Sequence, residues 1–251
     1  MACLQADGKP SDEAASVEMR DDGLYSFTCR RDHKTITAIQ EQKFEVLFDL
    51  GAMALLDGYP REAVTSMAAS IERFFEYYIQ VISLKHGVAF ETLTKAWKLV
   101  SRQSERQVGA FLSLYLLENK SALEPFILES RFSKQVDGKN PRTLTEFRND
   151  VVHKGYIPSS ELVLAYGDLI YQFIYGLIEE LRRTSPDHML KAAFHHVGKS
   201  STLAEATTIT TMSIPTLICL ALAKRPASTF EEALKALQAY RPSQGYARQF
   251  N

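Results

Sequence analysis

The sequence predicts an all-α protein, built as an up-and-down helical bundle with a short N-terminal β-hairpin and a C-terminal helical extension. Between residues 41 and 184, apolar side chains recur every three or four positions, which is the spacing of one helix face. The segments between these stretches are short, and short connections favour antiparallel neighbours. Hydrophobic residues make up 45% of the 251 positions, enough for one sizeable core and an appendage.

The N-terminal part of the chain is predicted to hold a disordered tail and then the hairpin. Residues 1–23 are polar and acidic and lack the apolar stretch of a secretory signal. Over residues 24–40, two segments that begin at Leu24 and Thr35 alternate apolar and polar side chains around a charged turn. Such alternation of β-favouring residues is typical of two paired strands.

The bundle is predicted over residues 41–184, with helix breaks at glycine and proline. The first helix ends at Gly58, and Pro60 opens a long helix over residues 60–86. Shorter helices follow, and Pro158 precedes a last amphipathic helix. The apolar stripe of the long helix is formed by Ala63, Val64, Met67, Ala68, Ile71, Phe74, Phe75, Tyr78, Ile79 and Ile82. Either core or dimer surface is expected for its aromatic residues Phe74, Phe75, Tyr77 and Tyr78.

A basic loop and a short capped helix lie between these helices. Residues 131–142 contain a single acidic residue against four basic ones, which are Arg131, Lys134, Lys139 and Arg142. The segment from Thr143 to Glu146 has the residue order of a capping box, so a helix is expected to start there and to end at Gly155.

Residues 185–251 are predicted to form the helical extension. Its clearest element follows Ser228 and Thr229, a cap before helically spaced apolar residues. Two arrangements remain open for this region: a small C-terminal subdomain, or extra helices on the bundle.

Composition limits the classes of function. A formal net charge of −1 argues against a general polyanion binder, so any affinity for nucleic acid needs a local basic patch. Cys3, Cys29 and Cys219 are far apart, which argues against a disulfide framework or a cysteine-rich zinc site and fits a reducing cytosol. The most apolar stretch, residues 214–223, is well short of the roughly 20 residues of a membrane span. We therefore expect a cytoplasmic protein without a membrane partner.

The candidate site is the sequence Arg-Asn-Asp-Val-Val-His at residues 148–153, on the short helix. At about 100° per residue, Asn149 and His153 lie about 40° apart and share one face. The long side chain of Arg148 can reach that face, whereas the two valines are expected to face the bundle. The helix would then present a cation, an amide and an imidazole together, beside the basic loop.

These side chains suit the cleavage of a phosphodiester. A guanidinium, here Arg148, binds phosphate oxygens and stabilises charge in the transition state. An imidazole with a pKa near about 6.5, here His153, transfers protons at neutral pH. Asn149 would orient the histidine or bind the phosphate. No cofactor or metal is expected, because no ligand cluster has suitable spacing. The candidate substrate-binding residues are Lys154, Arg142, Lys139 and Lys134.

The spacing of arginine and histidine alone is weak evidence for a catalytic site. Arg183 and His188 repeat it, but Pro186 breaks the helix that would hold them on one face. Context favours the first pair, which lies in a capped helix after a basic loop.

Structural interpretations stand beside the catalytic one. His153 would then be an ordinary bundle histidine, and Arg148 an ion-pair partner of Glu146 or Asp150. Three charged residues of the long helix either line the site or form a solvated face. They are Glu72, Arg73 and Glu76.

Residues 148–156, with the helical pair before them and the amphipathic helix after them, resemble HEPN (higher eukaryotes and prokaryotes nucleotide-binding) domains. The resemblance covers roughly residues 41–184, and the asparagine after the arginine is its most specific feature. It implies an all-α bundle that dimerises, so that two motifs form one composite, metal-independent ribonuclease site. It also implies that Arg148 and His153 are catalytic and Asn149 supports them, with the RNA 2′-hydroxyl as attacking group and a cyclic phosphate as product.

Members of this family often act in phage defence, in toxin–antitoxin pairs and in CRISPR-associated systems. One subgroup of toxins carries a tyrosine two residues after the histidine, which its antitoxin modifies. Here Tyr156 stands one position later, so the resemblance does not extend to that mode of regulation.

Two hypotheses follow. The first is an endoribonuclease that cuts RNA as a homodimer, acting as a toxin or phage-defence effector with an antitoxin or another regulatory partner protein. The second is a non-catalytic module of the same kind that binds a nucleotide or a partner protein.

Overall fold

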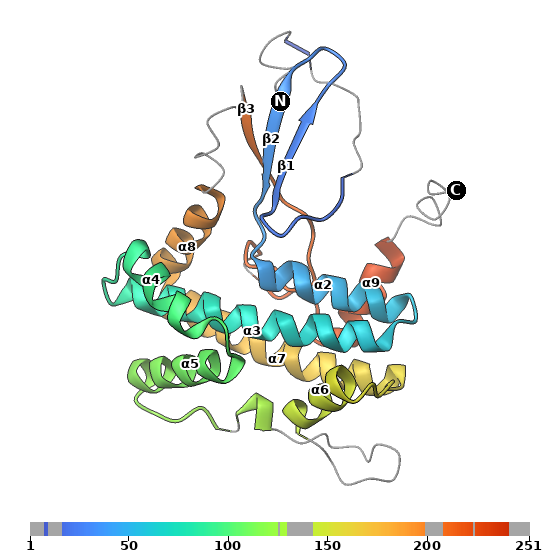
Figure 1. Cartoon of the computed structure of the whole chain (residues 1–251), viewed down its shortest axis with the longest axis vertical. Helices are drawn as coiled ribbons and strands as arrows, with labels where there is room; N and C mark the ends of the chain where they lie inside the picture. The colour runs from blue at the N-terminus through green and yellow to red at the C-terminus, as the bar shows by residue number, and fades with distance from the viewer. Residues whose placement is uncertain are drawn as a thin grey trace. The chain divides into compact units, whose positions relative to one another are not determined.

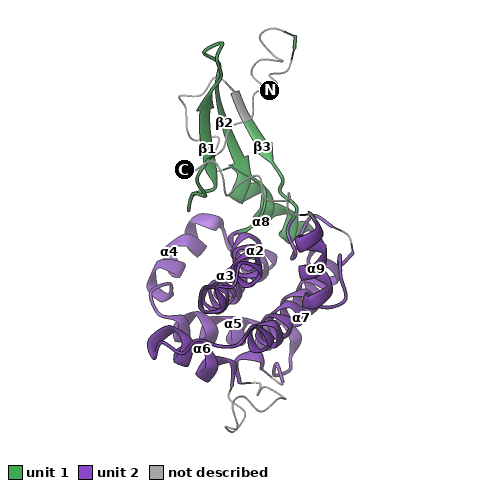
Figure 2. Ribbon diagram, turned by 90° about the vertical axis from the view of Figure 1, so that its right-hand side faces the viewer, with its two compact units in different colours: residues 1–42, 187–215 green, residues 43–186, 216–251 purple. Residues whose placement is uncertain are grey.

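Helices make up most of the described chain, and a small sheet accompanies them (Figure 1). The computed structural model describes residues 8–9, 17–124, 126–129, 143–198, 208–222 and 224–240. The chain divides into two units, the first formed by residues 1–42 and 187–215 and the second by residues 43–186 and 216–251 (Figure 2). Most of the predicted tail and the whole of the basic loop, residues 131–142, lie outside the described residues.

The first unit contains a three-stranded sheet. Strands β1 (Leu24–Thr28) and β2 (Lys34–Ile39) pair antiparallel, which confirms the predicted hairpin. Strand β3 (Thr208–Met212) pairs with β2 in parallel, so β2 is the central strand. The hydroxyls of Thr37 and Thr210 are 2.8 Å apart across this pairing.

The prediction of a helical extension over residues 185–251 missed one strand. Helices α8 (Pro186–Gly198) and α9 (Phe230–Tyr240) are present as expected, but β3 lies between them in the sequence. The β3 segment is rich in threonine and has no apolar period of its own. Its extended form is stabilised by backbone pairing with a strand about 170 residues earlier, which a local pattern does not reveal.

The second unit begins with two closely packed helices, α2 (Lys43–Leu56) and α3 (Pro60–Lys85), which lie side by side (Figure 1). Their close approach requires a glycine at position 51. A Cβ atom there would lie 2.8 Å from Cγ of Met67 and 3.0 Å from the carbonyl oxygen of Ala63. The long predicted helix and its break before Pro60 are confirmed.

Helix α3 is the centre of the second unit, because it packs against α2, α5 (Ser104–Asn119), α6 (Leu144–His153) and α7 (Ser160–Thr184). Helix α4 (Phe90–Val100) lies next to α3 and α5. All members of the predicted stripe on α3 are buried. The aromatic group 74–78 belongs to this core and not to a dimer surface: the four rings are at most 4% exposed.

The chain after residue 215 returns to the second unit and covers α2 and α7. Two buried carboxylates of α2 accept backbone N–H groups from this segment: Asp49 from Leu217 at 2.8 Å, and Glu45 from Leu220 at 2.8 Å. Helix α9 then packs on α7 and α2, with the buried ring of Phe230 at 5.2 Å from that of Phe48. Of the two arrangements considered for this region, α9 is thus an extra helix on the bundle.

Helix α7 is long and apolar enough to cross a membrane by length and composition alone. In its most apolar window, 56% of the residues are buried inside the protein. A core helix of a water-exposed bundle passes the same test, so this property is weak evidence for a membrane span.

Candidate functional site

The candidate motif lies on α6, whose two ends are fixed by local hydrogen bonds. At the start, Glu146 N donates to Thr143 Oγ1 at 3.1 Å, and Thr143 N donates to Glu146 Oε2 at 2.8 Å. This reciprocal pair is the predicted capping box. At the end, Gly155 takes a positive φ of 70°, which a residue with a side chain rarely adopts. The predicted helix limits are confirmed.

One face of α6 anchors it to the bundle. Leu144, Phe147 and Val151 are fully buried, and the ring of Phe147 lies 5.4 Å from that of Tyr166 on α7. The neighbouring valine at position 152 is half-buried, so only the first of the two valines faces the core fully. The motif is therefore carried by a helix whose orientation is set by packing.

Arg148 is held by two polar contacts on the other side of the helix. Its Nη1 donates to Oδ1 of Asn149 at 3.0 Å, and its Nη2 lies 3.6 Å from Oε1 of Glu72 on α3. The ion-pair partner is therefore Glu72, and not Glu146 or Asp150 as the structural interpretation expected. The Arg148 side chain is 30% exposed and so remains partly accessible to solvent.

The three charged residues considered on α3 do not act alike. Glu72 lines the site through its contact with Arg148. Arg73 instead pairs with Glu76 at 2.6 Å and donates to Gln107 of α5 at 2.7 Å. Glu72 is the residue whose role the sequence left open and the structure resolves.

The electrostatics of the site are set by burial. Burial raises the pKa of Glu72 above its ordinary value, and the guanidinium groups of Arg148 and Arg73 act in the opposite direction. Burial also raises the pKa of the Tyr166 phenol, which lies close enough to Arg148 for the two groups to interact. Arg148 thus interacts with both a half-buried carboxyl group and a buried phenol.

His153 occupies the last turn of α6 and is exposed, whereas Asn149 one turn earlier is half-buried. In the described part of the chain, no side chain is hydrogen-bonded to the imidazole. Arg61 of α3 lies at the same end of the helix, where its Nε and Nη2 donate to the carbonyl oxygens of Val151 and Val152 at 3.3 and 3.5 Å. The sequence carries no signal for this contact, which joins residues 90 positions apart.

Of the four candidate substrate-binding residues, Lys154 is among the residues that the structure describes. Lys154 is 76% exposed and pairs with Asp150, one turn back, at 2.7 Å. Lys134, Lys139 and Arg142 lie outside the described residues. The structure therefore brings Arg148 and Asn149 into contact and places His153 one turn further along the helix.

The second arginine–histidine pair is divided between two helices, as its proline predicted. Arg183 lies on α7, which ends at Thr184, and His188 lies on α8, which begins at Pro186. Within the described ranges, no group of three or more His, Cys, Asp and Glu side chains is arranged to hold a metal ion.

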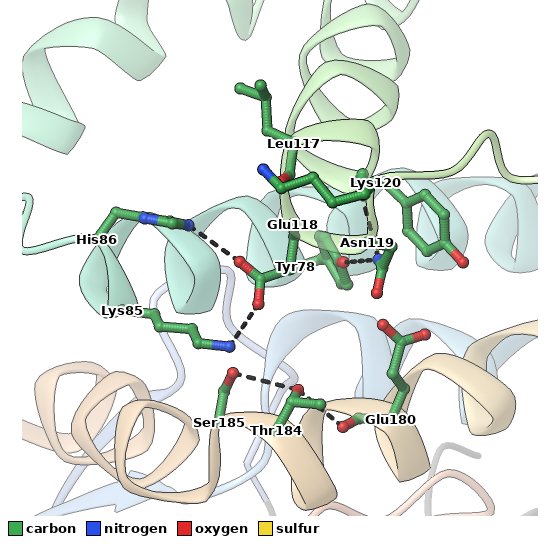
Figure 3. Close-up of polar contacts among 11 residues, drawn as sticks. Tyr78, Lys85, His86, Leu117, Glu118, Asn119, Lys120, Glu180, Thr184 and Ser185 are labelled. Atoms are coloured by element: carbon green, nitrogen blue, oxygen red, sulfur yellow. Dashed lines mark hydrogen bonds and ion pairs between the residues drawn. The ribbon is translucent and has the colours of Figure 1, made fainter.

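A separate polar cluster joins the C-terminal ends of α3 and α5 (Figure 3). The Glu118 carboxylate accepts from Lys85 and from His86, the latter at 3.0 Å, and the Lys85 contact holds its pKa below the ordinary value. Asn119 lies 3.5 Å from the Tyr78 hydroxyl beside it. Because Lys85 and His86 both bind Glu118 of the neighbouring helix, we interpret the cluster as a structural link between α3 and α5.

No family model, no curated protein and no solved structure matches the chain. The side chains themselves are therefore what indicates a function. On α6 these are an oriented guanidinium, an amide and an exposed imidazole one turn apart, beside a carboxyl group whose pKa is raised.

Proposed function

We propose that the protein is a metal-independent endoribonuclease of the HEPN type that works as a homodimer, in the role of a toxin or phage-defence effector. The observation that carries this proposal is the orientation of Arg148 by Glu72 and Asn149 on a capped helix that also bears His153. The helical bundle around α3 agrees with an all-α frame of this kind, and the HEPN assignment itself rests on the resemblance of the motif.

In the proposed reaction, the RNA 2′-hydroxyl attacks the adjacent phosphorus and the bond to the 5′-oxygen breaks, which leaves a 2′,3′-cyclic phosphate. The guanidinium of Arg148, whose side chain is partly exposed, would bind the phosphate oxygens, where negative charge develops. His153 is exposed and can reach a bound strand, so it would take the 2′-hydroxyl proton or protonate the leaving 5′-oxygen. A dimer would supply a second histidine, which lets the two proton transfers use different side chains.

The decisive experiment compares RNA cleavage by the wild-type protein and two histidine variants. Purified protein is incubated with total RNA in EDTA, and the fragments are tested for cyclic phosphate ends. We expect His153→Ala to lose at least about 100-fold in rate, the usual contribution of a general acid or base. His188→Ala is the matched control, because it removes the histidine of the second pair, and it should cleave like wild type. Equal cleavage by His153→Ala and wild type would exclude the proposed role of the motif.

The dimer and the cellular role are tested separately. Sedimentation equilibrium should give twice the chain mass, and a monomer that still cleaves would exclude a composite site. Induced expression in a bacterial host should arrest growth with the wild-type chain and not with His153→Ala. Growth arrest by both proteins at equal levels would argue against a toxin that acts through this site.

A second candidate function, a non-catalytic module that binds a nucleotide or a partner protein, is favoured by one observation. Arg148 already has an acidic partner, Glu72, and the His153 ring has no described group that fixes its orientation. Thermal shift measurements with mononucleotides and oligonucleotides, with Arg148→Ala as control, distinguish the two functions. Stabilisation by a nucleotide that requires Arg148, without any RNA cleavage, would favour the binding module.

A further inference from the structure

A concentration of positive charge lies at the C-terminal end of α7, away from the candidate motif. An open hollow of the second unit is lined there by Glu179, Arg182, Arg183, Lys224 and Arg225. The lining thus has four cationic side chains and one carboxylate, in a chain whose formal net charge is −1. Counted along α7 from Tyr166, which neighbours Arg148, the hollow is about 24 Å from the motif at 1.5 Å per residue.

Arg182 is fixed in place by neutral acceptors. Its Nη2 donates to the carbonyl oxygens of Cys219 at 3.1 Å and of Leu222 at 2.6 Å. These bonds hold the guanidinium still without neutralising its charge. A fixed guanidinium loses little side-chain freedom when an anion binds to it.

Arg225, which also lines the hollow, is fixed in a similar way. Its Nη2 donates to Gln172 Oε1 at 2.6 Å and to the Ser228 carbonyl at 2.7 Å. Its guanidinium carbon lies 4.7 Å from the ring centre of Tyr171 and 5.1 Å from that of Tyr175. Its Nε is buried and has no hydrogen-bond partner among the described groups. The positive charge of Arg225 is therefore also retained.

The remaining two cations, Arg183 and Lys224, are exposed. Neither makes an ion pair or a hydrogen bond with another residue that the structure describes. Cations that gather without enough carboxylates repel one another, and a bound anion would relieve that repulsion. Two held guanidinium groups and two free cations form an arrangement suited to an anion with several oxygens.

We propose that this hollow is a phosphate-binding site for the backbone of single-stranded RNA, an assignment of ligand that rests on the proposed ribonuclease function. Guanidinium groups match the geometry of phosphate oxygens, and an open hollow admits a continuous strand. The nearby rings of Tyr171 and Tyr175 are covered by Arg225 and offer no free face for a base. Binding here depends on phosphates and not on base sequence, and it adds a contact remote from the cleaved bond.

The test measures binding of 2′-O-methylated RNA, which has no free 2′-hydroxyl to attack, in the His153→Ala background, so that cleavage cannot interfere in any outcome. The double variant Arg183→Gln and Lys224→Gln removes the two exposed charges and leaves the held arginines in place. The control, Lys95→Gln and Lys98→Gln, removes two exposed charges from α4. Affinity for a fluorescent 16-nucleotide oligouridylate is followed by anisotropy between 50 and 200 mM salt, about the range in which phosphate contacts are resolved.

We expect the hollow variant to bind about 20-fold more weakly at 0.1 M salt. The slope of log affinity against log salt concentration should become shallower by about 1.4, because each phosphate contact to a single strand contributes about 0.7 to that slope. The control should bind like its parent, and an oligoadenylate should bind the parent like the oligouridylate. Equal affinity of the hollow variant and the control would overturn the proposal. The proposal would also be overturned if polyglutamate of matched charge displaced the labelled oligonucleotide as effectively as unlabelled RNA does, because the hollow would then bind an acidic polypeptide equally well.

Failure of this site and failure of the proposed function give different results. If the hollow variant loses RNA binding while His153→Ala cleaves RNA as wild type does, the phosphate site stands and the catalytic proposal falls. If His153→Ala abolishes cleavage while the hollow variant binds normally, the phosphate site falls and the catalytic proposal stands.

Discussion

The ion pair between Arg148 and Glu72 allows a quantitative test of how the candidate site is built. The two charged groups are 3.6 Å apart and are 30% and 26% exposed. At that distance the Coulomb attraction is about 1 kcal/mol in water and about 5 kcal/mol at an effective dielectric constant of 20. Desolvation and solvent screening offset most of the larger figure, so we expect a net coupling of about 1 kcal/mol.

A double-mutant cycle measures this coupling. The free energy of unfolding in urea is compared for the wild type, Arg148→Ala, Glu72→Gln and the double variant. Arg148→Ala should cost about 1 kcal/mol more when Glu72 is present than when Gln replaces it, because the half-buried carboxylate then loses its cation. Lys95→Ala, at an exposed position of α4, is the control in the same cycle, because the charges that interact with Glu72 are those of Arg148, Arg73 and Glu105.

The pH dependence adds an independent check with a definite sign. Because burial raises the pKa of Glu72, its carboxyl group binds a proton more readily in the folded protein than in the unfolded chain. Its contribution to stability is therefore fully present below the unfolded value of 4.5 and is lost as the pH rises through the folded pKa. The stability of Glu72→Gln relative to wild type should rise from acid to neutral pH. A coupling of zero at neutral pH, or a relative stability that falls over this range, would refute the described geometry.

Two further predictions test the parts of the fold that position the site. Thr143→Ala removes the threonine side chain of the capping box on α6 and should lower the free energy of unfolding by about 1 kcal/mol. The control Thr94→Ala, at an exposed position of α4, should change the free energy of unfolding by less than about 0.5 kcal/mol. Phe230→Ala leaves a cavity at a fully buried position between α9, α2 and α7, and it should lower the free energy of unfolding in urea by about 3–5 kcal/mol. The control Leu99→Ala, at a position that is 74% exposed, should change the free energy of unfolding little. Equal effects of a variant and its control would contradict the packing described here.

The elements that the sequence predicts well are those with local causes. The start of α6 follows from Thr143 and Glu146, and its end follows from a glycine with positive φ. The stripe of α3 follows from the helical period, and the hairpin from alternation in adjacent segments. In each case the residues that determine the structure lie within a few positions of one another.

The features that the sequence does not reveal depend on partners far along the chain. Strand β3 is extended because it pairs with β2, and nothing in its own residues indicates that partner. Glu45 and Asp49 are acidic residues on a buried face of α2, and they are explained only by the backbone N–H groups that reach them from the segment after residue 215. An acidic residue at an apolar position was the available signal, but it does not identify what the carboxylate binds.

Partners far along the chain also explain why the motif at residues 148–153 cannot be evaluated from the spacing of its arginine and histidine. Glu72 on α3 and Asn149 contact the Arg148 guanidinium, and Tyr166 on α7 interacts with it from the core. A helix of this length is marginal alone, so an isolated α6 would not fix these groups. The pair at residues 183–188 has the same spacing, yet it is divided between α7 and α8. A loss of cleavage in Glu72→Gln, at a pH where the folded state is intact, would therefore indicate that catalysis needs the position of Arg148 as well as its charge.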